Sequence, residues 1–127
     1  MNNAASILIL IFLGITFIQS SSDKVIDWKG NLEFMKAHFA ETSLKKLVAI
    51  ALFHLLIMEL LSGILCIVGC IQLIINGGRI FGLYGAIISC ITLIMLLTGQ
   101  RIAKDYDGAR TIVIYFIPSI MAVYWLG

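Results

Sequence analysis

Four long stretches of this 127-residue chain are almost free of Asp, Glu, Lys and Arg. They cover residues 1–22, 47–75, 80–100 and 111–127, and Glu59 is the one charged residue inside them. A bilayer core about 30 Å thick requires roughly 20 mostly apolar residues in a helix, and each stretch meets or nearly meets that length. Because 61% of the residues are hydrophobic and only 13% are charged, the bilayer must act as the solvent of this chain.

These stretches predict an all-α integral membrane four-helix bundle, a single membrane domain over residues 1–127. A transmembrane β-barrel is disfavoured because its strands alternate apolar and polar residues, whereas residues 7–13 and 93–97 are apolar on every side. Backbone groups in lipid must then be satisfied within helices. We expect membrane helices at about 4–23, 47–75, 80–100 and 109–126.

The first apolar stretch resembles a secretory leader in its position and in the small residues at its end. No Lys or Arg precedes its apolar run, and the run is long for the hydrophobic core of a leader. We therefore expect this segment to be a retained membrane helix.

The positive charges are distributed unequally between the two ends of the predicted bundle. Eight of the nine Lys and Arg residues fall between helices 1 and 2 or between helices 3 and 4, and only Arg79 falls on the other side. Short loops rich in Lys and Arg remain in the cytoplasm. We expect a multi-pass protein of the bacterial inner membrane with both termini, and the turn at residues 76–78, on the outer (periplasmic) side.

The connection between helices 1 and 2 is the longest segment outside the predicted spans. Asn31 is a plausible N-cap, and Leu32, Met35 and Phe39 recur at helical spacing. This pattern predicts an amphipathic helix over about 31–41 that lies in the membrane interface, with Trp28 just before it as an interfacial anchor.

No soluble catalytic motif is present in the sequence. It contains no phosphate-binding glycine loop, nucleophilic serine elbow, metal-type cysteine pair or cofactor fingerprint. His54 and Glu59 are five residues apart and therefore on different faces of a helix, so they form no metal pair. The loop at residues 101–107 is charge-balanced and too weakly basic for nucleic acid. We expect no cofactor, no metal, no nucleic-acid partner and no enzyme activity of the chain on its own.

The three cysteines lie inside predicted membrane helices. Cys66 and Cys70 share one face of helix 2, and Cys90 is in helix 3. Thiols in apolar surroundings behave as small inert hydrophobes, and two cysteines at that spacing on one helix make a poor disulfide. We expect a packing role with reduced thiols, and a bond from Cys90 to Cys66 or Cys70 is the redox alternative.

Several short motifs recur along the predicted helices: Gly14, Phe17, Asp23 and Lys24 in helix 1, Glu59, Gly63 and Gly69 in helix 2, and residues 100–106 after helix 3. These motifs resemble those of the DoxX family of small four-helix bacterial membrane proteins, which is named after a subunit of an archaeal thiosulfate:quinone oxidoreductase. The resemblance covers nearly the whole chain and departs from the family pattern at Ser21, where many relatives have a glycine.

The resemblance implies an auxiliary, non-catalytic subunit of a quinone-linked membrane redox complex. Its partners would be the lipid bilayer and other membrane protein subunits, with quinone or lipid contact. Two alternatives stay open: a structural accessory subunit of another inner-membrane assembly, and a small transporter or lipid-binding bundle, in which Pro118 would kink helix 4 and free a carbonyl.

Glu59 is the candidate on which function depends, because an ionisable side chain inside a membrane helix is costly and marks a functional site by default. At its depth it must be paired, hydrated or protonated. The family pattern pairs Glu59 with Lys24. Lys24 lies nearer the membrane surface and reaches Glu59 only by extending its aliphatic side chain along the helix. Gln19, Thr92 and Tyr115 lie at more compatible depths. The alternative is a structural acid that only joins helices through hydrogen bonds.

The orientation predicts which introduced cysteines are accessible from outside. Single cysteines at Asn2, Asn76 and Gly127 should react with an impermeant maleimide in intact cells, whereas cysteines at Asn31 and Asp107 should not. Labelling at Asp107 would reverse the proposed orientation.

Overall fold

A computed structural model describes residues 3–127, and it is helical with no strand in that part of the chain. Met1 and Asn2, the latter a predicted labelling position, lie outside the described residues. The five helices are α1 (Ala4–Ile26), α2 (Trp28–His38), α3 (Val48–Asn76), α4 (Ile80–Ile102) and α5 (Tyr106–Leu126). Helices α1, α3, α4 and α5 are long and apolar enough to cross a membrane. The predicted all-α membrane bundle is confirmed.

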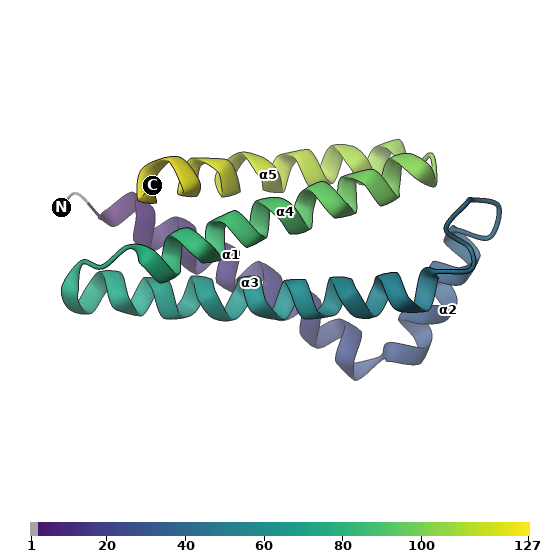
Figure 1. Ribbon diagram of the computed structural model, residues 1–127, viewed down its shortest axis with the longest axis horizontal. Helices are drawn as coiled ribbons and strands as arrows, with labels where there is room; N and C mark the ends of the chain where they lie inside the picture. Colours follow the sequence, from purple (N-terminus) through teal and green to yellow (C-terminus); the bar gives the residue numbers. More distant parts are fainter. Residues whose placement is uncertain (1–2) are drawn as a thin grey trace.

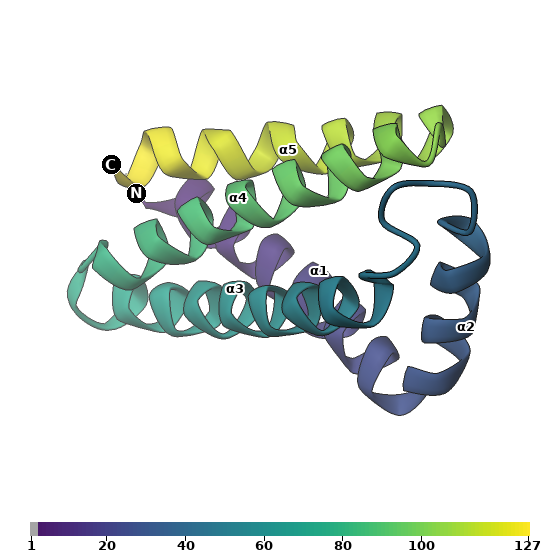
Figure 2. The ribbon, with the colours of Figure 1, turned by 45° about the vertical axis from the view of Figure 1, so that its right-hand side comes forward.

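The four long helices run lengthwise beside one another (Figure 1). Helix α3 packs extensively against α1 and α4, and α4 in turn packs against α5. The start of α1 and the end of α5 lie at the same end of the bundle as the α3–α4 turn, while α2 and the α4–α5 turn lie at the opposite end (Figures 1 and 2). All the Lys and Arg residues except Arg79 therefore belong to segments at or near the α2 end of the bundle.

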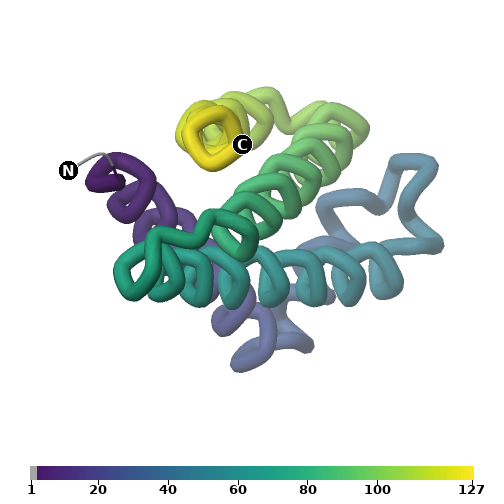
Figure 3. Tube along the Cα trace, turned by 60° about the vertical axis from the view of Figure 1, so that its left-hand side comes forward, coloured from purple at the N-terminus to yellow at the C-terminus, as the bar shows by residue number. Residues whose placement is uncertain are grey.

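Helix α1 crosses α3 obliquely, while α5 runs nearly along the long axis of the bundle (Figures 1 and 3). As a result α1 and α5 separate toward α2, although the rings of Phe12 and Tyr115 still stack between them with centroids 6.2 Å apart. Side chains of α1, α3, α4 and α5, among them Glu59 of α3, line a cavity between these helices.

Helices α2 and α5 begin earlier than the sequence predicted. In each case an aspartate at the N-cap explains the earlier start. Helix α2 begins at Trp28 because the carboxylate of Asp27 accepts from the Gly30 N–H at 3.2 Å. The predicted cap, Asn31, instead donates from Nδ2 to the carbonyl of Asp27 at 2.8 Å. Helix α5 begins at Tyr106 because Asp105 accepts from the Gly108 N–H at 3.0 Å. Both are N-cap interactions, which satisfy backbone donors in the first turn.

Glycines allow α3 and α4 to approach closely near their connecting turn. A Cβ atom on Gly69 would collide with the backbone of Gly82, and one on Gly85 would lie 2.8 Å from the backbone nitrogen of Cys66. Small residues at such crossings permit the van der Waals contact that drives helix association in lipid. Leu10, Leu13 and Phe17 of α1 complete the core beside this contact.

This packing predicts that Gly69→Ala destabilises the bundle by about 1–3 kcal/mol, because an added methyl group forces the backbones of α3 and α4 apart. The measurement is the unfolding free energy in detergent micelles. Gly99→Ala is the matched control, since a Cβ atom there meets only Phe39 Cζ at an ordinary 3.6 Å. Equal stability of the two variants would contradict the close α3–α4 contact.

Candidate functional site

Glu59 lies in the middle of α3 with only 1% of its surface exposed. It belongs to the buried face of this helix, together with Ser62, Gly63, Cys66 and Cys70. Residues 59, 63, 66 and 70 follow one another at intervals of three or four, so they share one face of the helix, and the structure buries that face. The opposite face of α3, which includes Ile57, Leu61 and Ile64, is exposed.

Lys24 forms an ion pair with this buried carboxylate. Its Nζ lies 2.8 Å from Glu59 Oε1 and also donates to Ser20 Oγ at 3.0 Å. The Lys24 side chain is 13% exposed, so the pair is largely shielded from the surroundings. Lys24 also occupies the last turn of α1, where the negative end of the helix dipole favours a cation.

The oblique crossing of α1 over α3 brings these two side chains together (Figure 3). The sequence indicated that Lys24 is nearer the membrane surface than Glu59 and reaches it only along its stem. In the structure α1 continues to Ile26, which places Lys24 within the helix rather than beyond its end.

The second carboxylate oxygen of Glu59 has no hydrogen-bond partner among residues 3–127, although it is buried. A carboxylate offers about four acceptor positions, and an unsatisfied buried acceptor costs about 1–3 kcal/mol. Ser62, one turn along α3, does not supply the missing donor, since its hydroxyl lies 3.4 Å from Thr92 Oγ1. Glu59 therefore keeps an unused acceptor at a membrane depth where such groups are costly.

A cavity of about 330 Å³ lies beside this carboxylate. Helix α1 contributes most of its polar lining, α4 contributes leucines, and α5 contributes one isoleucine and one tyrosine. The volume lies at the lower end of the range for small-molecule sites, about 300–1,000 Å³. The lining residues are Thr16, Phe17, Gln19, Ser20, Asp23, Glu59, Leu93, Leu96, Ile112 and Tyr115.

The predicted intramembrane site has four residues, and the structure brings all four close together. Three of them line one cavity, and the fourth forms an ion pair with Glu59. Gln19 and Tyr115 line the cavity with Glu59, and Lys24 contacts the carboxylate directly. Thr92 does not join them, because its hydroxyl donates to the Ile88 carbonyl of its own helix at 2.7 Å.

Sequence reasoning missed three polar residues of α1 that line the same cavity: Thr16, Ser20 and Asp23. Thr16, Ser20 and Lys24 are spaced by four residues, and so are Gln19 and Asp23. Residues at this spacing share one face of a helix. A search of the apolar stretch for polar residues at that period would have found them.

The cysteines are buried free thiols at helix contacts. Cys66 Sγ lies 3.8 Å from Ser89 Oγ on α4, and Cys70 Sγ lies 3.9 Å from the Ile7 carbonyl on α1. These contacts fit the expected packing role. The oxidation state of the thiols in cells stays a prediction.

The two histidines lie apart from this site. His54 is exposed on the outer face of α3. His38 Nε2, at the end of α2, lies 3.2 Å from Gln100 Oε1 and 3.6 Å from Asp105 Oδ2. Among residues 3–127, no group of three or more His, Cys, Asp or Glu side chains is placed to hold a metal ion.

Comparison of the chain with protein-family models, with curated proteins and with solved structures finds no match. The resemblance to DoxX-family proteins stays a hypothesis that depends on the sequence motifs.

The buried ion pair predicts strong coupling between Lys24 and Glu59. Lys24→Met should lower the unfolding free energy by about 3–5 kcal/mol, because it leaves a buried carboxylate unpaired. Adding Glu59→Gln to this variant should recover most of the loss. The measurement is a double-mutant cycle in detergent micelles.

The matched control is Arg110→Met, which removes the exposed Arg110–Asp107 pair at the α2 end of the bundle. Exposed pairs contribute little to stability, so this change should be small. Additive effects of Lys24→Met and Glu59→Gln would contradict the ion pair.

Proposed function

We propose that this chain is an auxiliary, non-catalytic subunit of a quinone-linked membrane redox complex, in which the cavity beside Glu59 receives the polar head of a quinone. The observation that carries this proposal is the buried, unpartnered carboxylate oxygen of Glu59, a residue that lines a cavity among α1, α3, α4 and α5. The sequence motifs shared with DoxX-family proteins supply the link to quinone chemistry.

The polar wall of the cavity suits both redox forms of a quinone head. Gln19 lines the cavity, and its side-chain amide has N–H donors that would bind a quinone carbonyl. Glu59 Oε2 accepts from the hydroxyl that replaces this carbonyl in the quinol. Leu93, Leu96 and Ile112 give the opposite wall an apolar surface for the ring.

Stacking positions Tyr115 at this cavity. Its ring lies 6.2 Å from that of Phe12 with an interplanar angle of 25°, which is a favourable offset arrangement. Tyr115 therefore adds a hydroxyl to the lining from α5, opposite the groups that α1 and α3 provide. A head bound between them contacts three helices and is oriented by more than one hydrogen bond.

Electron transfer would belong to another subunit, because this sequence has no motif that holds a redox cofactor. The outer faces of the helices carry exposed apolar side chains such as Phe53, Ile74 and Ile114. In a membrane such faces contact lipid chains or neighbouring helices. Both kinds of contact fit an accessory subunit.

We place the α2 end of the bundle in the bacterial cytoplasm, because eight cationic residues belong to segments at or near that end. Arg79, the cation of the other end, has a local structural role. It donates to the Trp125 carbonyl and to Asn3 Oδ1, both at 2.8 Å. It thereby joins the first residues of α1 to the last turn of α5.

The test is calorimetric titration of the purified chain in lipid nanodiscs with a short-chain quinol. We expect Glu59→Gln to weaken quinol binding about tenfold, because a hydrogen bond to a charged acceptor is worth about 1.5–3 kcal/mol. Tyr115→Phe should weaken binding, whereas Tyr84→Phe, at an exposed position of α4 outside the cavity, should not.

A different result identifies Glu59 as a purely structural acid. If Glu59→Gln folds and binds quinol like the wild type while Glu59→Leu fails to fold, the carboxylate only joins helices and the proposed site is wrong.

A further inference from the structure

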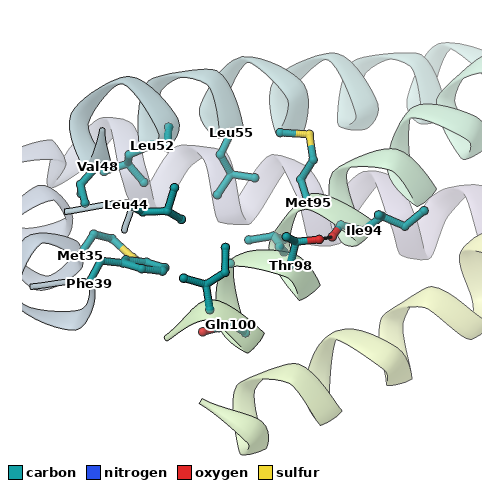
Figure 4. A pocket seen from close by; sticks show the side chains of 14 residues that line it. Met35, Phe39, Leu44, Val48, Leu52, Leu55, Ile94, Met95, Thr98 and Gln100 are labelled. Carbon is teal, nitrogen blue, oxygen red and sulfur yellow. Dashed lines mark hydrogen bonds between the residues drawn. The ribbon is translucent and has the colours of Figure 1, made fainter. Parts of the chain in front are cut away.

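A second cavity, of about 350 Å³, lies near the α2 end of the bundle. It occupies the space where α3 and α4 diverge, and the segment that follows α2 covers it (Figure 2). Phe39, Leu44, Leu55 and Met95 contribute side chains to it from three parts of the chain (Figure 4). This cavity is distinct from the one beside Glu59, and the proposed quinone function does not use it.

The lining of this second cavity is almost entirely hydrocarbon. Its two polar side chains are engaged elsewhere: the Thr98 hydroxyl donates to the Ile94 carbonyl at 2.9 Å, and Gln100 Oε1 contacts His38 Nε2 at 3.2 Å. A buried water requires several polar partners, which this lining does not provide. An empty space of this size would forfeit the dispersion contacts of its walls, so an apolar occupant is favoured.

Four cationic residues lie within two positions of lining residues in the sequence. Lys45 and Lys46 follow the lining residue Leu44, and Arg101 and Lys104 lie on either side of the lining residue Ile102. All four are exposed. None of them lies within 4.0 Å of an acidic group among the described residues, since Asp105 faces His38 and Asp107 faces Arg110.

We propose that this cavity holds one acyl chain of an anionic phospholipid, whose phosphate lies against Lys45, Lys46, Arg101 and Lys104. The apolar lining selects a hydrocarbon chain, and the unpaired cations select a negative headgroup. Basic sites between membrane helices at the cytoplasmic surface bind anionic headgroups in this way. A second copy of the chain is a poorer occupant, because it would bring the same four cations to the same place.

The chain contacts suggest a variant that fills the cavity without disturbing the backbone. Gly99 lines the cavity, and a Cβ atom on it would meet only Phe39 Cζ, at 3.6 Å. Gly99→Leu therefore extends a side chain toward Phe39 and into the space that the acyl chain would take. Ala51→Leu, at an exposed lining position on α3, is a second filling variant.

The experiment is native mass spectrometry of the chain released from nanodiscs made with equal amounts of phosphatidylglycerol and phosphatidylcholine. We expect one retained phosphatidylglycerol per wild-type chain and its loss in Gly99→Leu. Lys45→Gln should reduce retention about fivefold, the effect of one cation near an anionic headgroup. Lys29→Gln makes the same charge change at an exposed position on α2 outside the cavity and should leave retention unchanged.

Three outcomes would overturn the proposal: equal retention of the two lipids, undiminished retention in both filling variants, or a wild-type dimer that Gly99→Leu dissociates. Lipid retention is measured in a different experiment from quinol binding at Glu59. A negative result for the lipid site therefore leaves the proposed quinone site untouched, and the reverse also holds. Circular dichroism of each variant verifies that it is folded, and the Lys45→Gln and Lys29→Gln pair keeps the test decisive if both filling variants unfold.

Discussion

The need to satisfy a charged side chain inside a membrane governs the arrangement of α1 and α3. Glu59 is nearly fully buried, and an isolated carboxylate in such surroundings is strongly disfavoured. Lys24 meets this requirement only because α1 crosses α3 obliquely and reaches the level of Glu59. The same crossing separates α1 from α5 and leaves the cavity. The ion pair and the space beside it thus have one geometric origin.

Close packing of α3 and α4 at one end of the bundle and their divergence at the other explain the second cavity. Gly69 and Gly82 bring α3 and α4 into backbone contact near their turn, and the two helices then separate toward α2. Phe39 and other apolar side chains line the resulting space, whereas Glu59 lines the other cavity with polar groups of α1. The cavity beside Glu59 is polar because α1 lines it with polar side chains. The second cavity is apolar because the segment after α2 lines it with apolar ones.

The sequence predicted the four long helices well, because runs free of charge determine membrane spans almost directly. It placed the starts of α2 and α5 too late, since the capping aspartates Asp27 and Asp105 lie outside the apolar patterns. The buried face containing Glu59 followed from helical periodicity. The pairing of Glu59 with Lys24 was implied by the family resemblance and not by helical periodicity. The geometry of this contact and the two cavities could not be predicted, because they depend on helix crossing angles that residue spacing along one chain does not specify.

The distance between Lys24 Nζ and the Glu59 carboxyl carbon, measured by solid-state NMR in lipid bilayers, is the most direct test of the buried ion pair. The protein would carry ¹⁵N-labelled lysine and ¹³C-labelled glutamate, and Glu59→Gln would identify the signal. Because the Nζ and Oε1 atoms lie 2.8 Å apart, we expect strong nitrogen–carbon dipolar coupling and its loss in Glu59→Gln. A Glu59 signal with no coupling to a lysine would contradict the ion pair and the site built around it.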